Sequence, residues 1–231
     1  MQETNSTIKT NVQFLSAKEA VAKIPDAARM MVGGFGLSGL PDYLLQAVID
    51  YTDIDNFTII SNNITENSNA YELFMQNRIK KAIGTYFTTS REVVKAYREG
   101  RIEIELIPQG TFSEALRLGG AGIPAFYTPT SAGTELAKDK ESRVFDGREY
   151  VLERSLRADV ALIKAHKADK AGNLVYRKAG RNFNPMMAMA ADLTIVEVDE
   201  VVEVGELDPE AIVTPFIFVD VVVNKGGTDC E

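Results

Sequence analysis

The sequence contains a glycine-rich loop whose residues could bind an anion. Residues 33–41 read Gly-Gly-Phe-Gly-Leu-Ser-Gly-Leu-Pro and lie between a predicted strand, residues 28–32, and a predicted helix, residues 41–51. Backbone N–H groups of such a loop, together with the positive end of the helix, can face a phosphate or a carboxylate. Pro41 suits the first helical turn because its missing N–H would have no partner there. A tight turn that only packs the strand on the helix is the alternative.

From Gly34 to Gly39 the loop also spells G-x-G-x-x-G, the pattern of dinucleotide-binding proteins. An NAD site of that kind needs an acidic residue at the end of the next strand, roughly 20 residues further on, to hold the ribose hydroxyls. The next predicted strand, residues 57–61, is followed by two asparagines. Because no carboxylate stands there, the pattern does not predict an NAD enzyme.

Hydrophobic periodicity predicts alternating helices and strands around this loop. The predicted helices cover residues 16–24, 41–51, 70–81, 90–100 and 111–119, and a short apolar helix holds Met186, Met187 and Met189 as core residues. The predicted strands cover residues 28–32, 57–61, 102–107, 160–165, 173–177, 193–198 and 212–223. Ser16 is the expected N-cap of the first helix, and Thr111 with Glu114 fits a capping box. The alternation predicts an α/β fold with a mainly parallel sheet covered by helices.

Two segments do not fit this alternation simply. Residues 119–150 are rich in Gly, Pro, Thr and charge, and we interpret them as a long excursion from the domain. The predicted strand at residues 212–223 is so apolar that, at an exposed sheet edge, it would promote aggregation. It is therefore either buried in the subunit's own core or covered by a partner, and partial cover by another subunit is the interpretation we favour.

Composition limits the classes of protein. The chain has 231 residues, of which 45% are hydrophobic and 25% charged, so a single globular domain at residues 13–224 is expected, with a flexible arm at 1–12 and a tail at 225–231. The net charge of −8 argues against nucleic acid as a partner. No apolar run is long enough to span a membrane. The single cysteine, Cys230, indicates a reducing, cytoplasmic location without a structural zinc.

Other candidate residues favour structural roles. His166, the single histidine, lies between lysines, so we interpret it as structural. Glu66 stands in the run Thr-Glu-Asn-Ser and is interpreted as exposed and not catalytic. Between residues 182 and 224 there is no Lys or Arg, while nine residues are acidic, so this region would repel the phosphates of a coenzyme.

Several motifs in order along the chain resemble one known family. They are GGFGLSGLP at Gly33, SNN at Ser61, PQGT at Pro108, GGAGIPAFYTPT at Gly119 and RNFNP at Arg181. From about Ala17 to Val219, the sequence resembles the A subunit of the two-subunit, family I 3-oxoacid CoA-transferases. Its last predicted strand departs from the family's usual ending, which often carries basic residues.

The resemblance implies a Rossmann-like three-layer α/β/α fold of the CoA-transferase and NagB/RpiA-like type. It implies transfer of coenzyme A from an acyl-CoA to a short-chain 3-oxo carboxylic acid, by a ping-pong mechanism through a glutamyl-CoA thioester. The nucleophilic glutamate would belong to a partner B subunit, in a heterodimer or an A2B2 heterotetramer, so no catalytic residue is expected in this chain. The coenzyme A thioester would be a substrate, with no tightly bound cofactor, no metal and no membrane partner.

The resemblance also implies roles for individual residues. The expected lining of the coenzyme A or acyl site is Gly33, Gly34, Phe35, Gly36, Leu37, Ser38 and Gly39. Asn62, Asn63 and Gln109 would orient the substrate, since each follows a strand at the ligand-binding side of a parallel sheet and carries an amide donor. The alternatives are that both asparagines form a turn and that Gln109 only stabilises its loop.

Two other functions stay open at this point. One is a sugar-phosphate isomerase on a similar scaffold, which would need its own acid and base from carboxylates and lysines. The other is a non-catalytic module that binds acyl-CoA without turnover. The identity of the acids exchanged depends on a pocket shared with an unseen subunit.

Overall fold

A computed structural model describes residues 11–226 of the chain. In it the chain forms a central sheet of eight strands that run parallel to their neighbours. In spatial order the strands are β1 (Gln13–Phe14), β14 (Val221–Asn224), β12 (Ala191–Val198), β9 (Ala158–Lys164), β2 (Arg29–Val32), β3 (Phe57–Ile60), β4 (Ile79–Gly84) and β5 (Glu103–Leu106). The predicted parallel α/β sheet is confirmed. The predicted arm and tail fall almost wholly outside the described residues.

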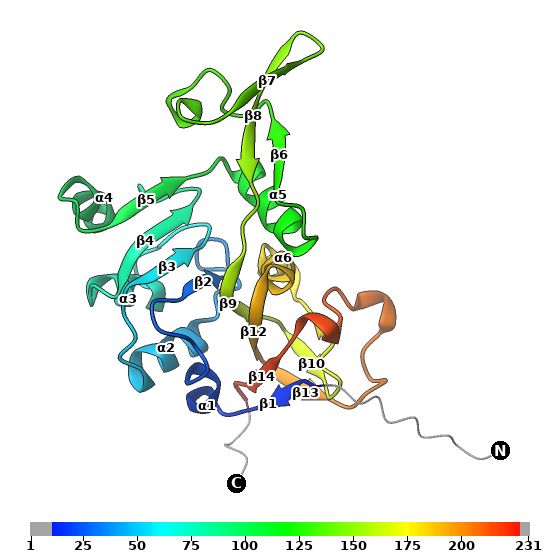
Figure 1. Ribbon diagram of the computed structural model, residues 1–231. Helices are drawn as coiled ribbons and strands as arrows, with labels where there is room; N and C mark the ends of the chain where they lie inside the picture. The colour runs from blue at the N-terminus through cyan, green and yellow to red at the C-terminus, as the bar shows by residue number, and fades with distance from the viewer. Residues whose placement is uncertain (1–10, 227–231) are drawn as a thin grey trace.

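Helices cover both faces of the sheet, which gives the three layers seen in Figure 1. One face carries α1 (Ala17–Val21), α2 (Asp42–Tyr51), α3 (Asn69–Met75) and α4 (Arg91–Arg98). The other face carries α5 (Gln109–Gly120) and α6 (Asn184–Met189). Met187 is fully buried in this second layer and the half-buried Met186 packs against it, so the predicted core role is confirmed for these two, whereas Met189 is only half-buried.

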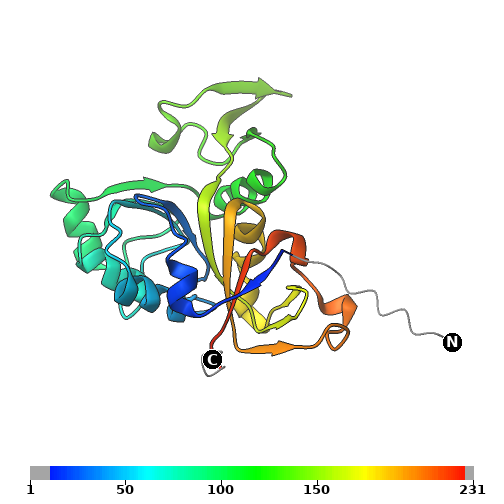
Figure 2. The same ribbon diagram turned by 60° about the horizontal axis from the view of Figure 1, so that its bottom comes forward.

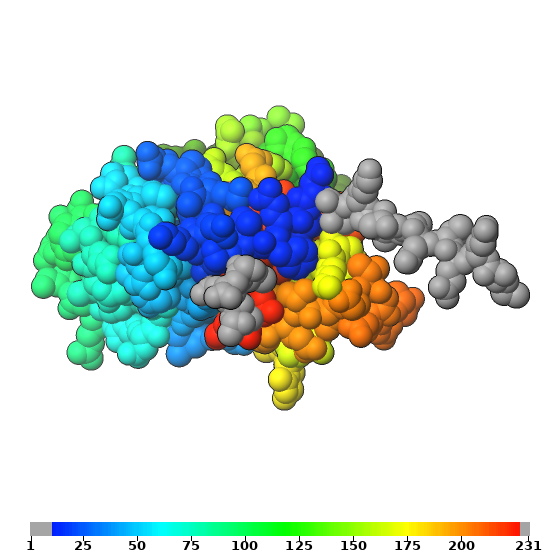
Figure 3. All heavy atoms as spheres, turned by 90° about the horizontal axis from the view of Figure 1, so that it is seen from below, coloured from blue at the N-terminus to red at the C-terminus, as the bar shows by residue number. Residues whose placement is uncertain are grey.

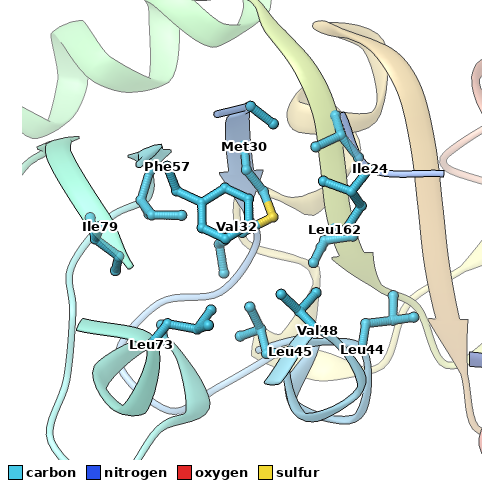
Figure 4. Close-up of a cluster of buried hydrophobic side chains, with 14 of the residues drawn as sticks. Ile24, Met30, Val32, Leu44, Leu45, Val48, Phe57, Leu73, Ile79 and Leu162 are labelled. Carbon is cyan, nitrogen blue, oxygen red and sulfur yellow. The ribbon is translucent and has the colours of Figure 1, made fainter. Parts of the chain in front are cut away.

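The alternation of side chains along the strands explains the two cores. Met30 and Val32 of β2 point into the layer with α2, while Met31 between them points into the layer with α5 and α6. On α2, the fully buried Val48 stands four positions after Leu44 and three after Leu45, so the three side chains share one face. Figure 4 shows these side chains meeting Met30 and Val32 beneath the sheet.

Two smaller sheets lie outside the central one. The first contains β11 (Leu174–Val175), β10 (Lys167–Asp169) and β13 (Glu200–Val202). The second contains β6 (Ala125–Thr128), β8 (Arg148–Arg154) and β7 (Ser142–Phe145) in antiparallel pairs. This second sheet and the loops between its strands span most of the predicted excursion at residues 119–150 and stand away from the body of the molecule (Figures 1 and 2). Sequence patterns indicated the excursion but not its strands.

The helix predicted over residues 70–81 is wrong in its second half. The helix α3 ends at Met75, and Asn77 then adopts a left-handed conformation with φ 57°. The chain continues as β4, which buries Ile79, Ala82 and Ile83. Within the predicted helix, Ile79 stands four positions after Met75, so the local apolar spacing also fits a helix that continues to residue 81.

The single strand predicted over residues 212–223 is also wrong. A short 3-10 helix, η3 (Pro209–Ala211), ends just before this segment, and a second, η4 (Phe216–Phe218), lies within it before β14 begins at Val221. Because β14 lies between β1 and β12, it is not an edge strand, and Val221, Val222 and Val223 are buried in the subunit's own core. Cover by a second subunit is therefore not needed for this strand.

Of the two helix beginnings predicted from the sequence, one is confirmed and one is wrong. Ser16 and Glu19 form the capping box of α1, so the predicted N-cap is confirmed. The box predicted for Thr111 and Glu114 is wrong, because α5 begins two residues earlier after Pro108 and Glu114 pairs with Arg117 at 2.6 Å.

Three more features complete the fold. Seen from below in Figure 3, the first elements of the chain lie beside the segment that follows β12. A further 3-10 turn is η1 (Glu135–Ala137). No helix in residues 11–226 is long and apolar enough to cross a membrane.

Candidate functional site

The carboxyl ends of the parallel strands meet at one edge of the central sheet. The glycine loop follows β2, the two asparagines follow β3, and Gln109 comes shortly after β5, so the sheet brings the predicted site residues to this edge. From β2 the chain runs outward through β3, β4 and β5, whereas from β9 it runs outward to β12 and β14 on the other side. The boundary between β2 and β9 is therefore the topological switch point, where parallel sheets bind ligands.

The glycine loop has a backbone that other residues could not follow easily. Gly34, Gly36 and Gly39 have φ values of 114°, 59° and 68°, which L-residues with a side chain rarely adopt. Gly33 is required for a different reason, because a Cβ there would lie 1.8 Å from Oδ1 of Asn184. Glycine is thus needed at each of the four positions by conformation or by contact.

Three asparagine side chains hold the loop from both sides. The Gly34 N–H donates to Oδ1 of Asn182 at 3.1 Å, and the Gly36 N–H donates to Oδ1 of Asn63 at 3.3 Å. The Asn184 amide, which is fully buried, donates to Gly39 O at 3.1 Å. The loop is therefore fixed between β3 and the segment that leads into α6.

Most N–H groups of the loop already have protein acceptors. The N–H groups of Gly33, Phe35 and Ser38 donate to backbone oxygens, in addition to the two that asparagines accept. Within residues 11–226, the N–H groups of Leu37 and Gly39 have no acceptor. These two N–H groups and the exposed side chains of Phe35, Leu37 and Ser38 are open to a ligand.

A carboxylate of the protein occupies the positive end of the helix that follows the loop. Glu197 of β12 is 1% exposed, and its Oε2 accepts the Leu44 N–H of α2 at 3.0 Å. Its Oε1 lies 3.3 Å from Nζ of Lys164. Burial raises the pKa of Glu197, although the Leu44 N–H and the Lys164 ammonium oppose that effect. The helix end is thus satisfied from within the protein.

Asn62 and Asn63 lie at the predicted place, but their amide donors have protein partners. Asn62 is 4% exposed and donates from Nδ2 to Oγ1 of Thr85 at 2.6 Å. Asn63 donates from Nδ2 to the Thr65 hydroxyl while it accepts the Gly36 N–H. Both residues therefore connect strand ends and loop, and any role toward substrate is added to that.

Gln109 has more freedom. It is the first residue of α5, is exposed, and its side-chain amide has no hydrogen bond within the described part of the chain. Three aromatic rings connect its helix to the glycine loop. Phe112 of α5 packs edge-on against Phe183 at 5.4 Å between ring centroids, and Phe183 stacks on Phe35 at 6.3 Å. Across residues 11–226, no three His, Cys, Asp or Glu side chains gather as metal ligands would.

Comparison with known proteins adds the family to this geometry. The family model described as Coenzyme A transferase matches residues 14–225. The chain belongs to the coenzyme A transferase family. It is 49% identical over 220 residues to the A subunit of the 3-oxoadipate CoA-transferase of Pseudomonas putida, covering 94% of this chain and 95% of that protein. It is 47% identical over 209 residues to the A subunit of the probable succinyl-CoA:3-ketoacid coenzyme A transferase of Bacillus subtilis (strain 168), covering 90% and 87%.

Solved structures agree with this coenzyme A transferase fold. The glutaconate coenzyme A-transferase of Acidaminococcus fermentans superposes with a TM-score of 0.81 at 20% identity, covering 92% of this chain and 75% of that one. An acyl-CoA transferase from Escherichia coli O157:H7, solved as a thioester complex with CoA, superposes with a TM-score of 0.80 at 22% identity. The match covers 95% of this chain and 50% of that one, so the chain spans half of the Escherichia coli protein.

The prediction of a CoA-transferase A subunit from ordered motifs is therefore confirmed for the family and the enzyme class. Sequence reasoning missed four residues that hold the loop, the helix end and the strand ends of this candidate site: Thr85, Asn182, Asn184 and Glu197. Two of them lie in the RNFNP motif, which supplied the resemblance but no role. Nothing local in the sequence marked Thr85 or Glu197.

Proposed function

We propose that this chain is the A subunit of an enzyme that moves coenzyme A from an acyl-CoA to a short-chain 3-oxo carboxylic acid. The names of the similar proteins, which are A subunits acting on succinyl-CoA and a 3-ketoacid or on 3-oxoadipate, support the substrate class. The reaction would proceed by a ping-pong mechanism, with a glutamyl-CoA thioester on a partner B subunit. Coenzyme A is a substrate here, and no tightly bound cofactor is required.

The hydrogen-bond donors at the carboxyl edge of the sheet are the observation that supports this division of labour between the two subunits. An attacking carboxylate converts the thioester carbonyl into an oxyanion, which needs donors held in place beforehand. The N–H groups of Leu37 and Gly39, on a loop that asparagines fix, are such donors, and the exposed amide of Gln109 is a further donor at the same edge of the sheet. They would bind the acyl oxygen and the thioester while a glutamate from outside the chain attacks.

Carboxylates near the loop support the same division. Glu197 is buried against Leu44 and Lys164, and Asp42 accepts the Asn69 N–H at 3.1 Å. Both carboxylates therefore have partners within the protein and serve structural roles. Glu66 is exposed on the loop after β3, but it precedes a helix that Ser68 caps, and we assign it no catalytic role. A nucleophile from a second chain would complete the site.

The test is reconstitution of the chain with a B-type subunit. We expect the complex to transfer coenzyme A from succinyl-CoA to acetoacetate with parallel double-reciprocal plots, the sign of ping-pong kinetics. The trapped thioester should map by mass spectrometry to a glutamate of the partner, and Glu66→Gln should keep full activity. An adduct on this chain, or turnover by this chain alone, would overturn the proposal. We also place the enzyme in the cytoplasm, in line with its single cysteine.

A further inference from the structure

A cleft of about 470 Å³ opens at the switch point between β2 and β9. Ser38 and Gly39 of the glycine loop form one wall. The opposite walls come from the end of β9, with Lys164 and His166, and from the segment at residues 176–180. This volume is in the range of sites for small ligands, and the cleft shares a wall with the glycine loop.

The cleft is positively charged in a chain with a net charge of −8. Lys164, Arg177 and Lys178 line it, against one carboxylate, Asp199. Burial would raise the pKa of Asp199, but the hydrogen bond from His166 at 3.1 Å and the nearby Lys164 ammonium outweigh it and hold this pKa below its usual range. Asp199 is therefore an ion already paired within the protein.

Arg177 and Lys178 differ from Lys164 in having no protein partner. Both are exposed, and neither forms an ion pair or a side-chain hydrogen bond with any residue of the described chain. Lys164, by contrast, lies 3.3 Å from Glu197 and 3.6 Å from Asp199. The two unpaired cations stand at the cleft, where their charge is available to an anion.

The segment that carries these cations is fixed to the glycine loop. Lys178, the first residue of η2 (Lys178–Arg181), has φ 51°, a conformation that is uncommon for a lysine and persists where the surroundings enforce it. The buried Asn184 donates to Gly180 O at 2.9 Å as well as to Gly39 O. A Cβ on Gly39 would lie 2.5 Å from Gly180 O, so the two backbones are in close contact.

We infer that this cleft binds an anionic end group of the substrate, a phosphate or a carboxylate, through Arg177 and Lys178. The inference rests on the proposed function and extends it. Two parts of an acyl-CoA carry such a group: the phosphates of coenzyme A and the far carboxylate of a dicarboxylic acyl chain. Ser38 and Gly39 belong to the glycine loop and also line the cleft, so a substrate lying on the loop can extend one end into the cleft.

Direct binding tests the cleft without turnover. Inorganic phosphate and succinate are titrated into the full chain by calorimetry, and the variant Arg177→Gln/Lys178→Asn is compared with wild type. Asn tolerates the left-handed backbone at position 178. At least one probe should bind wild type, and the variant should bind it on the order of tenfold more weakly, since two charge-assisted contacts are lost. The control is Lys95→Gln/Arg98→Gln on α4, which removes the same charges from an exposed helix away from the cleft.

The reconstituted complex identifies the source of the anion. If the cleft binds the far carboxylate, the double variant should lower kcat/KM for succinyl-CoA and leave butyryl-CoA unaffected. If it binds the coenzyme phosphates, both should fall together, and 3′-dephospho-CoA thioesters should show whether the 3′-phosphate is responsible. The inference would be overturned if neither phosphate nor succinate bound to the wild-type chain, or if the control variant weakened binding as much as Arg177→Gln/Lys178→Asn does. Probe binding without any transferase activity would refute the proposed function and leave the cleft as an anion site.

Discussion

Substitution of Gly33 by alanine should destabilise the chain through one identified side chain. The new Cβ would lie 1.8 Å from Oδ1 of Asn184, which is fully buried and cannot move into solvent. Asn184 accepts the Lys164 N–H at 3.0 Å and donates to Gly39 O and Gly180 O at 3.1 and 2.9 Å. At about 1 kcal/mol for each hydrogen bond, its displacement should cost about 3 kcal/mol.

Urea unfolding of the purified chain measures this loss, and two further variants make the assignment specific. Gly36→Ala is the matched control, since its Cβ meets no atom within 4 Å and its φ of 59° alone should cost about 1 to 2 kcal/mol. Asn184→Ala removes the atom that clashes, so Gly33→Ala should cost far less on that background than on wild type. The reasoning would be refuted if Gly33→Ala cost no more than Gly36→Ala, or if the effects of Gly33→Ala and Asn184→Ala simply added.

Three further predictions concern single side chains. Folding raises the pKa of Glu197 from its ordinary value of 4.5, so the wild-type chain should lose stability relative to Glu197→Gln as pH rises from about 4.5. Urea unfolding of both proteins at several pH values measures this difference, and a difference that does not change with pH would contradict the prediction. Thr85→Val should cost about 1 to 3 kcal/mol, since it leaves the buried Asn62 amide without its acceptor, while Thr85→Ser should be close to wild type in thermal unfolding. In the reconstituted complex, Gln109→Ala should lower kcat on the order of 100-fold with an unchanged urea midpoint, and unchanged kcat would remove its assigned role.

The sequence predicted well what depends on nearby residues. The glycine loop, the N-cap at Ser16 and the parallel alternation all follow from local residue types, and each is present in the structure. The errors arose where one local pattern fits two structures. The apolar spacing up to Ile79 fits a helix that continues to residue 81, and only pairing with β3 and β5 makes residues 79–84 a strand.

The residues that fix the site could not be found this way, because their partners are far away in sequence. Gly34 and Asn182 are 148 positions apart, and Leu44 and Glu197 are 153 apart. No periodicity connects such pairs. The family resemblance includes Asn182 and Asn184 as part of the RNFNP motif, but a motif identifies residues without showing which residues they contact. Their function as supports became visible only with coordinates.

The composition of the loop explains why these distant supports are needed. A glycine backbone gives the ligand close access, but it has no side chains of its own through which it can be held. Asparagine amides solve this problem, since each carries a donor and an acceptor and can hold two backbone segments together. Asn182 accepts from Gly34 and donates to Ser38 O at 3.0 Å, and Asn184 links the loop to the end of β9 and to Gly180. Donors held in this way need no reorganisation when charge develops on a bound thioester, so the rigidity built by the asparagines is itself part of the expected catalytic contribution of this chain.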